Sequence, residues 1–113
     1  MCSQDEICLI ISQICKRMNS IFPNEQFDVI LFGSYARNEA DDSSDIDVMF
    51  LVDSSRQSIQ EKYWQVGEAA AEALMAYGIV ISPVVENRAY YHANVNIIPF
   101  FKNVQREGVK IST

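Results

Sequence analysis

The apolar residues at the start of the chain recur every three or four positions, as they do on one face of an α-helix. Ser3 followed by Glu6 fits a capping box at the beginning of this helix, and Pro23 lies just beyond its end. The apolar positions of the face are Ile7, Ile11, Ile14, Met18 and Ile21. We therefore expect a first helix that ends before residue 23.

Three later segments combine short apolar runs with the β-branched and aromatic residues that are typical of strands. These segments are residues 27–32, 46–52 and 79–85. Pro83 has no N–H group to donate to a neighbouring strand. The third strand is therefore expected to lie at an edge of the sheet or to end near this residue.

The connecting segments complete the order of elements. Helices are predicted for residues 34–40, 55–77 and 97–106. Gly78 is a suitable stop for the second of these helices, residues 86–94 are polar and expected to be irregular, and residues 109–111 favour a short extended segment. This order predicts an α/β or α+β fold with helices on one face of the sheet. No repeat or linker divides the chain, so we expect a single domain over residues 1–113.

Charge and hydropathy narrow the range of partners. The chain of 113 residues is acidic, with 15 Asp and Glu against 9 Lys and Arg and a net charge of −6. Phosphate backbones repel such a surface, and the basic residues form no cluster, so a nucleic acid partner is disfavoured. No apolar run approaches the roughly 18–20 residues of a membrane helix, so no membrane partner is expected.

The cysteines and the first residues bear on location. Cys2, Cys8 and Cys15 are odd in number, and the second and third lie too far apart along the predicted helix for a disulfide. The N-terminus lacks the basic segment of a signal peptide. Reduced thiols and a cytoplasmic location are therefore expected.

A glycine turn follows the first predicted strand. Gly33 and Ser34 open the predicted short helix, and free N–H groups at a helix start favour an anion. Gly33 has no side chain, so a ligand can approach the backbone closely, and the Ser34 hydroxyl adds a donor. The turn therefore has the character of a phosphate site.

Two carboxylates follow at the start of the second predicted strand. Strand alternation places Asp45 and Asp47 on one face and turns Ile46 into the core. Two such groups ionise together most easily with a cation between them, and hard oxygen ligands suit Mg²⁺ or Mn²⁺. If the two strands are neighbours, the turn faces the carboxylates. That arrangement fits a metal-bound triphosphate, and phosphoryl or nucleotidyl transfer.

In these residues the chain resembles the minimal nucleotidyltransferase domains of the DNA polymerase β superfamily, whose signature is a Gly-Ser turn followed by Asp-x-Asp on the next strand. The matching residues are Gly33, Ser34, Arg37, Ser44, Asp45, Ile46 and Asp47. The resemblance is specific over residues 27–52 and looser over nearly the whole chain. It implies a small mixed sheet with helices packed on one face. It also implies that Asp45 and Asp47 bind catalytic Mg²⁺. By the same resemblance, Gly33 and Ser34 hold the β- and γ-phosphates of a nucleotide.

Arg37 and Ser44 are the further residues that the motif assigns to the nucleotide. Arg37 lies three residues after Ser34 on roughly the same helix face, so it either contacts a phosphate or pairs with a nearby acidic residue. The acidic residues within reach are Glu39, Asp41 and Asp42. Asn38 stands where many relatives have glycine, and asparagine tolerates a left-handed backbone.

The resemblance further implies a third carboxylate on a later strand, where this chain departs from the pattern. The expected position is near Ser82, which cannot act as a carboxylate. Glu86 lies four residues on, and alternation places it on the same face, so it is the expected catalytic substitute. The alternative for Glu86 is a solvated strand end.

The resemblance implies a Mg²⁺-dependent enzyme that transfers NMP, and in the expected case AMP from ATP, to an acceptor hydroxyl. Small stand-alone members of this kind are often antitoxins that silence a HEPN-type toxin by adenylylating or binding it, so a protein acceptor of that type is expected. Two alternatives stay open: a small-molecule acceptor, and a non-catalytic binding module with the same fold, which Ser82 motivates. A homo- or hetero-oligomer is compatible with each of them.

Overall fold

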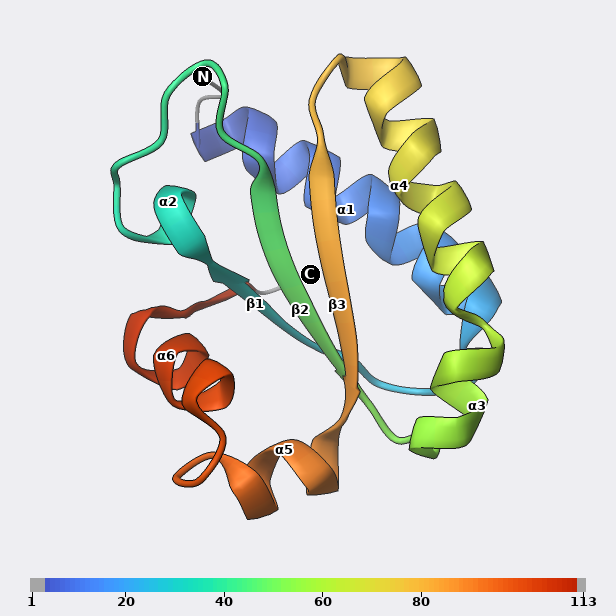
Figure 1. Ribbon diagram of the computed structural model, residues 1–113. Helices are drawn as coiled ribbons and strands as arrows, with labels where there is room; N and C mark the ends of the chain where they lie inside the picture. Colours follow the sequence, from blue (N-terminus) through green and yellow to red (C-terminus); the bar gives the residue numbers. More distant parts are fainter. Residues whose placement is uncertain (1–3, 112–113) are drawn as a thin grey trace.

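The computed structural model describes residues 4–111, so Ser3 of the expected capping box and Cys2 lie outside the described residues. Its centre is a four-stranded sheet in the order β3-β2-β1-β4 (Figure 1). The strands are β1 (Asp28–Phe32), β2 (Ile46–Val52), β3 (Ile81–Asn87) and β4 (Val109–Ile111). β1 pairs antiparallel with both β2 and β4, whereas β2 pairs parallel with β3. The expectation of a small mixed sheet is confirmed, and β3, which contains Pro83, lies at an edge.

Two long helices cover one face of the sheet. α1 (Gln4–Ile21) and α4 (Tyr63–Tyr77) pack against the side chains of β1 and β2 that point to this face (Figure 1). The buried residues of α1 include every apolar position of the predicted stripe: Ile7, Ile11, Ile14, Met18 and Ile21. Of the described helices, none is both long enough and apolar enough to cross a membrane.

The opposite face is partly covered as well, which the chain order did not predict. α5 (Arg88–Asn94) and α6 (Pro99–Glu107) pack there against the second set of strand side chains. The buried residues of this second cluster are Ile30, Met49, Leu51, Tyr91, Phe101 and Val104. β2 is apolar at successive positions from Val48 onward, so it buries side chains on both faces and needs a cover on each.

The segment after β2 forms two helices where one was expected. α3 (Arg56–Glu61) is followed by Lys62, whose φ of −101° and ψ of 2° depart from helical values, and α4 begins at the next residue. The Lys62 ammonium donates to the Ile21 carbonyl at 2.9 Å, which ties this break to the end of α1. Gly78 ends α4 in the left-handed conformation, with φ 68°, as predicted.

Residues 86–94 are ordered rather than irregular. β3 continues to Asn87, whose side chain then accepts a hydrogen bond from the Tyr90 N–H at 2.8 Å and caps α5. Arg88 donates to the Asp28 carboxylate at 2.8 Å and to the Leu51 carbonyl at 3.2 Å. These contacts order a polar segment that has no apolar periodicity of its own.

Candidate active site

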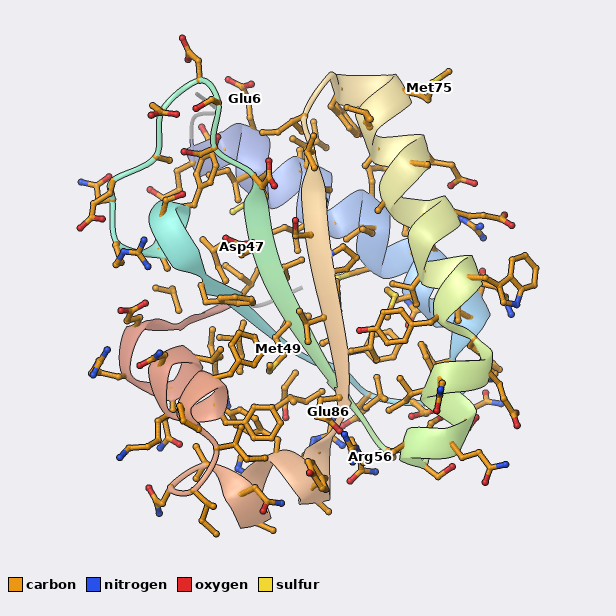
Figure 2. All side chains as sticks on the ribbon, viewed as in Figure 1. Glu6, Asp47, Met49, Arg56, Met75 and Glu86 are labelled. Atoms are coloured by element: carbon orange, nitrogen blue, oxygen red, sulfur yellow. The ribbon has the colours of Figure 1, made fainter. Side chains whose placement is uncertain are left out.

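The two carboxylates lie where β2 begins. Ile46 is fully buried, while Asp45 is exposed and Asp47 is half-buried on the opposite side of the strand. Figure 2 shows Asp47 near the upper end of the sheet in that view. The expected alternation is confirmed, and the two acidic side chains lie on the face that Met49 and Leu51 continue.

The glycine turn lies directly against Asp47. Phe32, the last residue of β1, pairs with Asp47, and the chain then enters the short helix α2 (Gly33–Ala36). Gly33 has φ +74°, and a Cβ atom there would lie 2.2 Å from the Asp47 Oδ2 atom. Only glycine meets both the backbone conformation and this approach. The turn and the carboxylate are therefore neighbours, as predicted from the two strands.

The electrostatics of the pair favour a cation. Burial raises the pKa of Asp47, and the nearby charge of Asp45 raises it further, while Arg37 acts in the opposite direction. A divalent ion between the carboxylates would favour the ionised form of both. Mg²⁺ is commonly held by one or two carboxylates together with substrate phosphates and water, so this donor set fits it.

Ser82 occupies the third position of the site. In the parallel ladder Ser82 is the register partner of Asp47, and its hydroxyl lies 3.5 Å from the Asp45 Oδ2 atom. Within residues 4–111, no group of three His, Cys, Asp or Glu side chains is arranged to hold a metal ion. The site therefore presents two carboxylates and one hydroxyl.

Glu86 does not join these residues. It is the register partner of Leu51, and its position in β3 is about 13 Å along the strand from Ser82. Asp47 and Glu86 are labelled toward opposite ends of the sheet in Figure 2. The sequence was right about the face of the sheet, but one strand carries both positions and its length separates them. The expectation that Glu86 replaces the missing carboxylate does not fit this geometry.

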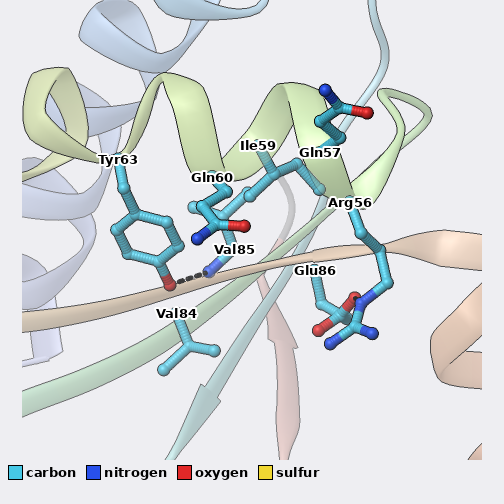
Figure 3. A pocket seen from close by; sticks show the side chains of 8 residues that line it. All are labelled: Arg56, Gln57, Ile59, Gln60, Tyr63, Val84, Val85 and Glu86. Atoms are coloured by element: carbon cyan, nitrogen blue, oxygen red, sulfur yellow. Dashed lines mark hydrogen bonds and ion pairs between the residues drawn. The ribbon is translucent and has the colours of Figure 1, made fainter.

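Glu86 belongs instead to a groove beside α3. Its carboxylate accepts from the Arg56 Nε atom at 3.0 Å and from the Asn87 N–H at 3.0 Å, and its side chain is only 13% exposed. Figure 3 shows Glu86 and Arg56 side by side in this groove, which has a volume of about 460 Å³. The Arg56 guanidinium also lies 3.9 Å from the centre of the Tyr90 ring. These contacts give Glu86 a structural role between α3 and α5.

Arg37 is held by two carboxylates. Its Nε atom donates to Glu39 at 3.1 Å, and its Nη1 atom donates to Glu107 at 3.1 Å. Glu39 was among the expected partners, whereas Glu107 at the end of α6 was not. Both contacts raise the pKa of Arg37. Asn38 adopts the left-handed conformation with φ 59°, which agrees with the tolerance expected of asparagine.

Ser44 fixes the loop that leads to the acidic pair. Its hydroxyl accepts from the Asp41 N–H at 2.9 Å, and its own N–H donates to the Asp41 carbonyl at 3.1 Å. The Asp41 carboxylate accepts in turn from Ser43, and these hydrogen bonds lower the pKa of Asp41. Ser44 therefore closes a local turn immediately before Asp45.

The chain matches a known protein family and curated proteins over most of its length. The sequence model of the family described as "Nucleotidyltransferase domain" matches residues 11–105. "Putative protein adenylyltransferase MJ0141" of Methanocaldococcus jannaschii is 32% identical over 106 residues, which cover 94% of this chain and 99% of that protein. "Putative protein adenylyltransferase MJ0604" of the same organism is 30% identical over 98 residues, which cover 87% of this chain and 90% of that protein.

A solved structure shares the fold. A chain of the structure described as "Crystal structure of the toxin-antitoxin with AMP-PNP" superposes with a TM-score of 0.53. The match covers 88% of this chain and 69% of that chain, at 19% sequence identity. A likeness at this level of identity concerns the arrangement of helices and strands.

Proposed function

This chain belongs to the nucleotidyltransferase domain family, and on that premise we propose that it transfers AMP from ATP to a hydroxyl group of a partner protein. The names of the two archaeal relatives support both the adenylyl group and the protein acceptor. The observation that carries the proposal is the approach of Gly33 to Asp47, because it joins a phosphate-type turn to a carboxylate pair.

Three residues contact the nucleotide in this proposal, and a fourth, Ser44, positions the loop before Asp45. The turn at Gly33 and Ser34 receives the β- and γ-phosphates, since the first N–H groups of a helix have no acceptor within it. Arg37 contributes the adjacent positive charge. Ser44 acts through the loop, because its hydrogen bonds to Asp41 fix the backbone that leads into Asp45.

Asp45 and Asp47 are the residues that would hold Mg²⁺. When bound, this ion supplies positive charge that offsets the negative charge of the phosphates and of the two carboxylates. Mn²⁺ suits the same oxygen donors. Asp47 lies in the β1–β2 ladder, so its backbone is already ordered before the nucleotide binds.

The reaction needs positioning more than proton transfer. An oxygen of the acceptor hydroxyl forms a bond to the α-phosphorus, the bond from that phosphorus to the β-phosphate oxygen breaks, and pyrophosphate leaves. The hydroxyl proton is released to solvent. Ser82 is no base at neutral pH, so the chain contributes alignment and charge neutralisation.

We propose a HEPN-type toxin as the partner, which would make this chain an antitoxin. The fold that the chain shares with a toxin–antitoxin structure is compatible with this assignment. The chain is small, and the exposed Asp45 lies beside the half-buried Asp47 where β2 begins, so a second protein can present a hydroxyl there. The cytoplasm, which supplies ATP and Mg²⁺, is the proposed location.

A second candidate is a binding module that silences its partner without catalysis. Ser82 favours it, because the position beside Asp45 and Asp47 offers a hydroxyl where relatives of the fold are expected to have a carboxylate. The two candidates share the partner and differ in whether AMP is transferred.

Transfer of a labelled AMP group distinguishes the enzyme from the binding module. The purified chain is incubated with Mg²⁺, ATP labelled at the α-phosphate, and a HEPN-type protein from the same genome. We expect label on the partner, and none with Asp45→Asn or Asp47→Asn. Glu72→Gln, which changes a distant ion pair with Arg17, should label as the wild type does. Partner binding without label would favour the binding module. The absence of both binding and label would refute both candidates.

A further inference from the structure

The Arg37 guanidinium is held from two parts of the chain. Glu39 follows it by two residues in the same loop, whereas Glu107 lies 70 residues further on, at the end of α6. The Glu107 contact therefore ties the segment after the phosphate turn to α6, which lies far from it in the sequence. Two of the five guanidinium N–H groups are used in these contacts with described residues, which leaves three for a ligand.

Glu107 is itself fixed by the turn that follows it. The Gly108 N–H donates to the Val104 carbonyl at 2.7 Å, and the chain enters β4 at the next residue. A Cβ atom at Gly108 would lie 2.3 Å from the Val104 oxygen and 2.5 Å from the Ile30 Cγ2 atom. The backbone after Glu107 is therefore packed tightly against β1. The Glu107 side chain is 27% exposed, and its other carboxylate oxygen lies 3.5 Å from the Arg106 Nη2 atom.

Arg37 lies close enough to the site for its charge to act on Asp47. It follows Ser34 by three residues, so both side chains lie on roughly the same side of the short α2 segment. An exposed ion pair of this kind adds little to folding stability. Its two carboxylates do, however, restrict the rotation of the arginine side chain.

We propose that Glu107 is a positioning residue: with Glu39 it holds Arg37 so that the remaining N–H groups of the guanidinium face the triphosphate. This inference rests on the proposed function. It assigns a role in nucleotide binding to a residue of α6, outside the motif that carries the turn and the two carboxylates. The carboxylate acts through Arg37 and does not touch the nucleotide.

The affinity for AMP-PNP in the presence of Mg²⁺, measured by calorimetry on the full chain, tests the proposal. Glu107→Gln removes the charge and keeps the shape. We expect it to weaken AMP-PNP binding by about three- to tenfold, because an Arg37 side chain released from Glu107 must be ordered when the nucleotide binds, with the melting temperature nearly unchanged. Glu72→Gln breaks another exposed Arg–Glu pair, with Arg17, and should bind as the wild type does.

A double-mutant cycle gives the readout that a merely structural role would not produce. Arg37→Gln and Arg37→Gln/Glu107→Gln should bind AMP-PNP equally, since Glu107 then has nothing to position. An unchanged or tighter affinity in Glu107→Gln, or an equal loss with and without Arg37, would overturn the positioning role while leaving the proposed function intact. A wild-type chain that does not bind AMP-PNP would overturn both.

Discussion

Gly33 shows how one residue can be required by its neighbour. Its positive φ and the closeness of Asp47 both exclude a side chain. The requirement comes from the approach of two strands, and the sequence contains only its result, a glycine before a serine.

Gly33→Ala should therefore destabilise the fold and remove nucleotide binding. We expect a loss of roughly 1–3 kcal/mol in the free energy of unfolding, measured with denaturant, because an alanine at positive φ is strained and its Cβ displaces the Asp47 carboxylate. Gly67 provides the matched control, since a Cβ there meets no atom within 4 Å. Gly67→Ala should stabilise α4 by about 0.5–1 kcal/mol. Equal effects of the two changes would contradict this account.

The raised pKa of Asp47 leads us to expect that the stability of the fold depends on pH. Burial and the neighbouring Asp45 raise its pKa in the folded chain, so the ionised carboxylate is less favourable there than in the unfolded chain. The ionised carboxylate therefore destabilises the folded state at pH values above the pKa that Asp47 has in the folded chain. This effect is absent below the pKa that it has in the unfolded chain.

Asp47→Asn should accordingly raise the melting temperature at pH 7 in the absence of divalent ions. The gain should vanish near pH 3, below the ordinary pKa of an aspartic acid. Adding Mg²⁺ and AMP-PNP should stabilise the wild type and leave the variant unchanged. A variant that is less stable at pH 7, or a gain that persists at pH 3, would show that the carboxylate is not destabilising.

The edge strand β3 is protected by its own side chains and by α4. Pro83 offers no donor, and the Val85 N–H donates to the Tyr63 hydroxyl at 3.2 Å (Figure 3). The Asn87 N–H donates to the Glu86 carboxylate. These arrangements reduce the number of free donors available for pairing with another strand.

Tyr63→Phe should lower the free energy of unfolding by about 1 kcal/mol, because it leaves the Val85 N–H without its partner. Tyr77→Phe is the matched control. Tyr77 lies on the same helix and is 40% exposed, against 41% for Tyr63. Its hydroxyl has no hydrogen-bond partner among residues 4–111, so the change should be close to neutral. Chemical denaturation of both variants checks the difference.

Across the whole molecule, the end of the sheet opposite the active site is held by Arg88. Its guanidinium donates to Asp28 at 2.8 Å, to the Gln26 carbonyl at 2.7 Å and to the Asp53 carboxylate. These partners belong to the segment before β1, to β1 itself and to the turn after β2. Arg88 thus fastens three parts of the chain at one point, and it lowers the pKa of Asp28.

Arg88→Gln should cost roughly 2–3 kcal/mol of unfolding free energy, as expected for lost hydrogen bonds to charged groups. AMP-PNP affinity of the folded variant should stay the same, since the residue lies at the far end of the sheet. Arg17→Gln, which breaks the exposed pair with Glu72, should cost no more than about 1 kcal/mol. Comparable losses in the two variants would show that Arg88 is an ordinary surface residue.

The strands, the glycine turn and the facing carboxylates were all predictable from the sequence. Each depends on a short-range rule: alternation along a strand places Asp45 and Asp47 together, and a glycine before a helix permits a close approach. The stripe of α1 likewise follows from a local period. These features needed only neighbours in the chain and the pairing of two consecutive strands.

Only the tertiary structure decided what reaches the site. The β2–β3 register placed Ser82 beside the acidic pair and Glu86 at the other end of the strand, although alternation gave both the same face. The course of α6 brought Glu107 to Arg37 across 70 residues. The course of the chain after β3 likewise decided that α5 and α6 cover the second face of the sheet. Such contacts depend on distances along and between elements, which a periodic pattern does not contain.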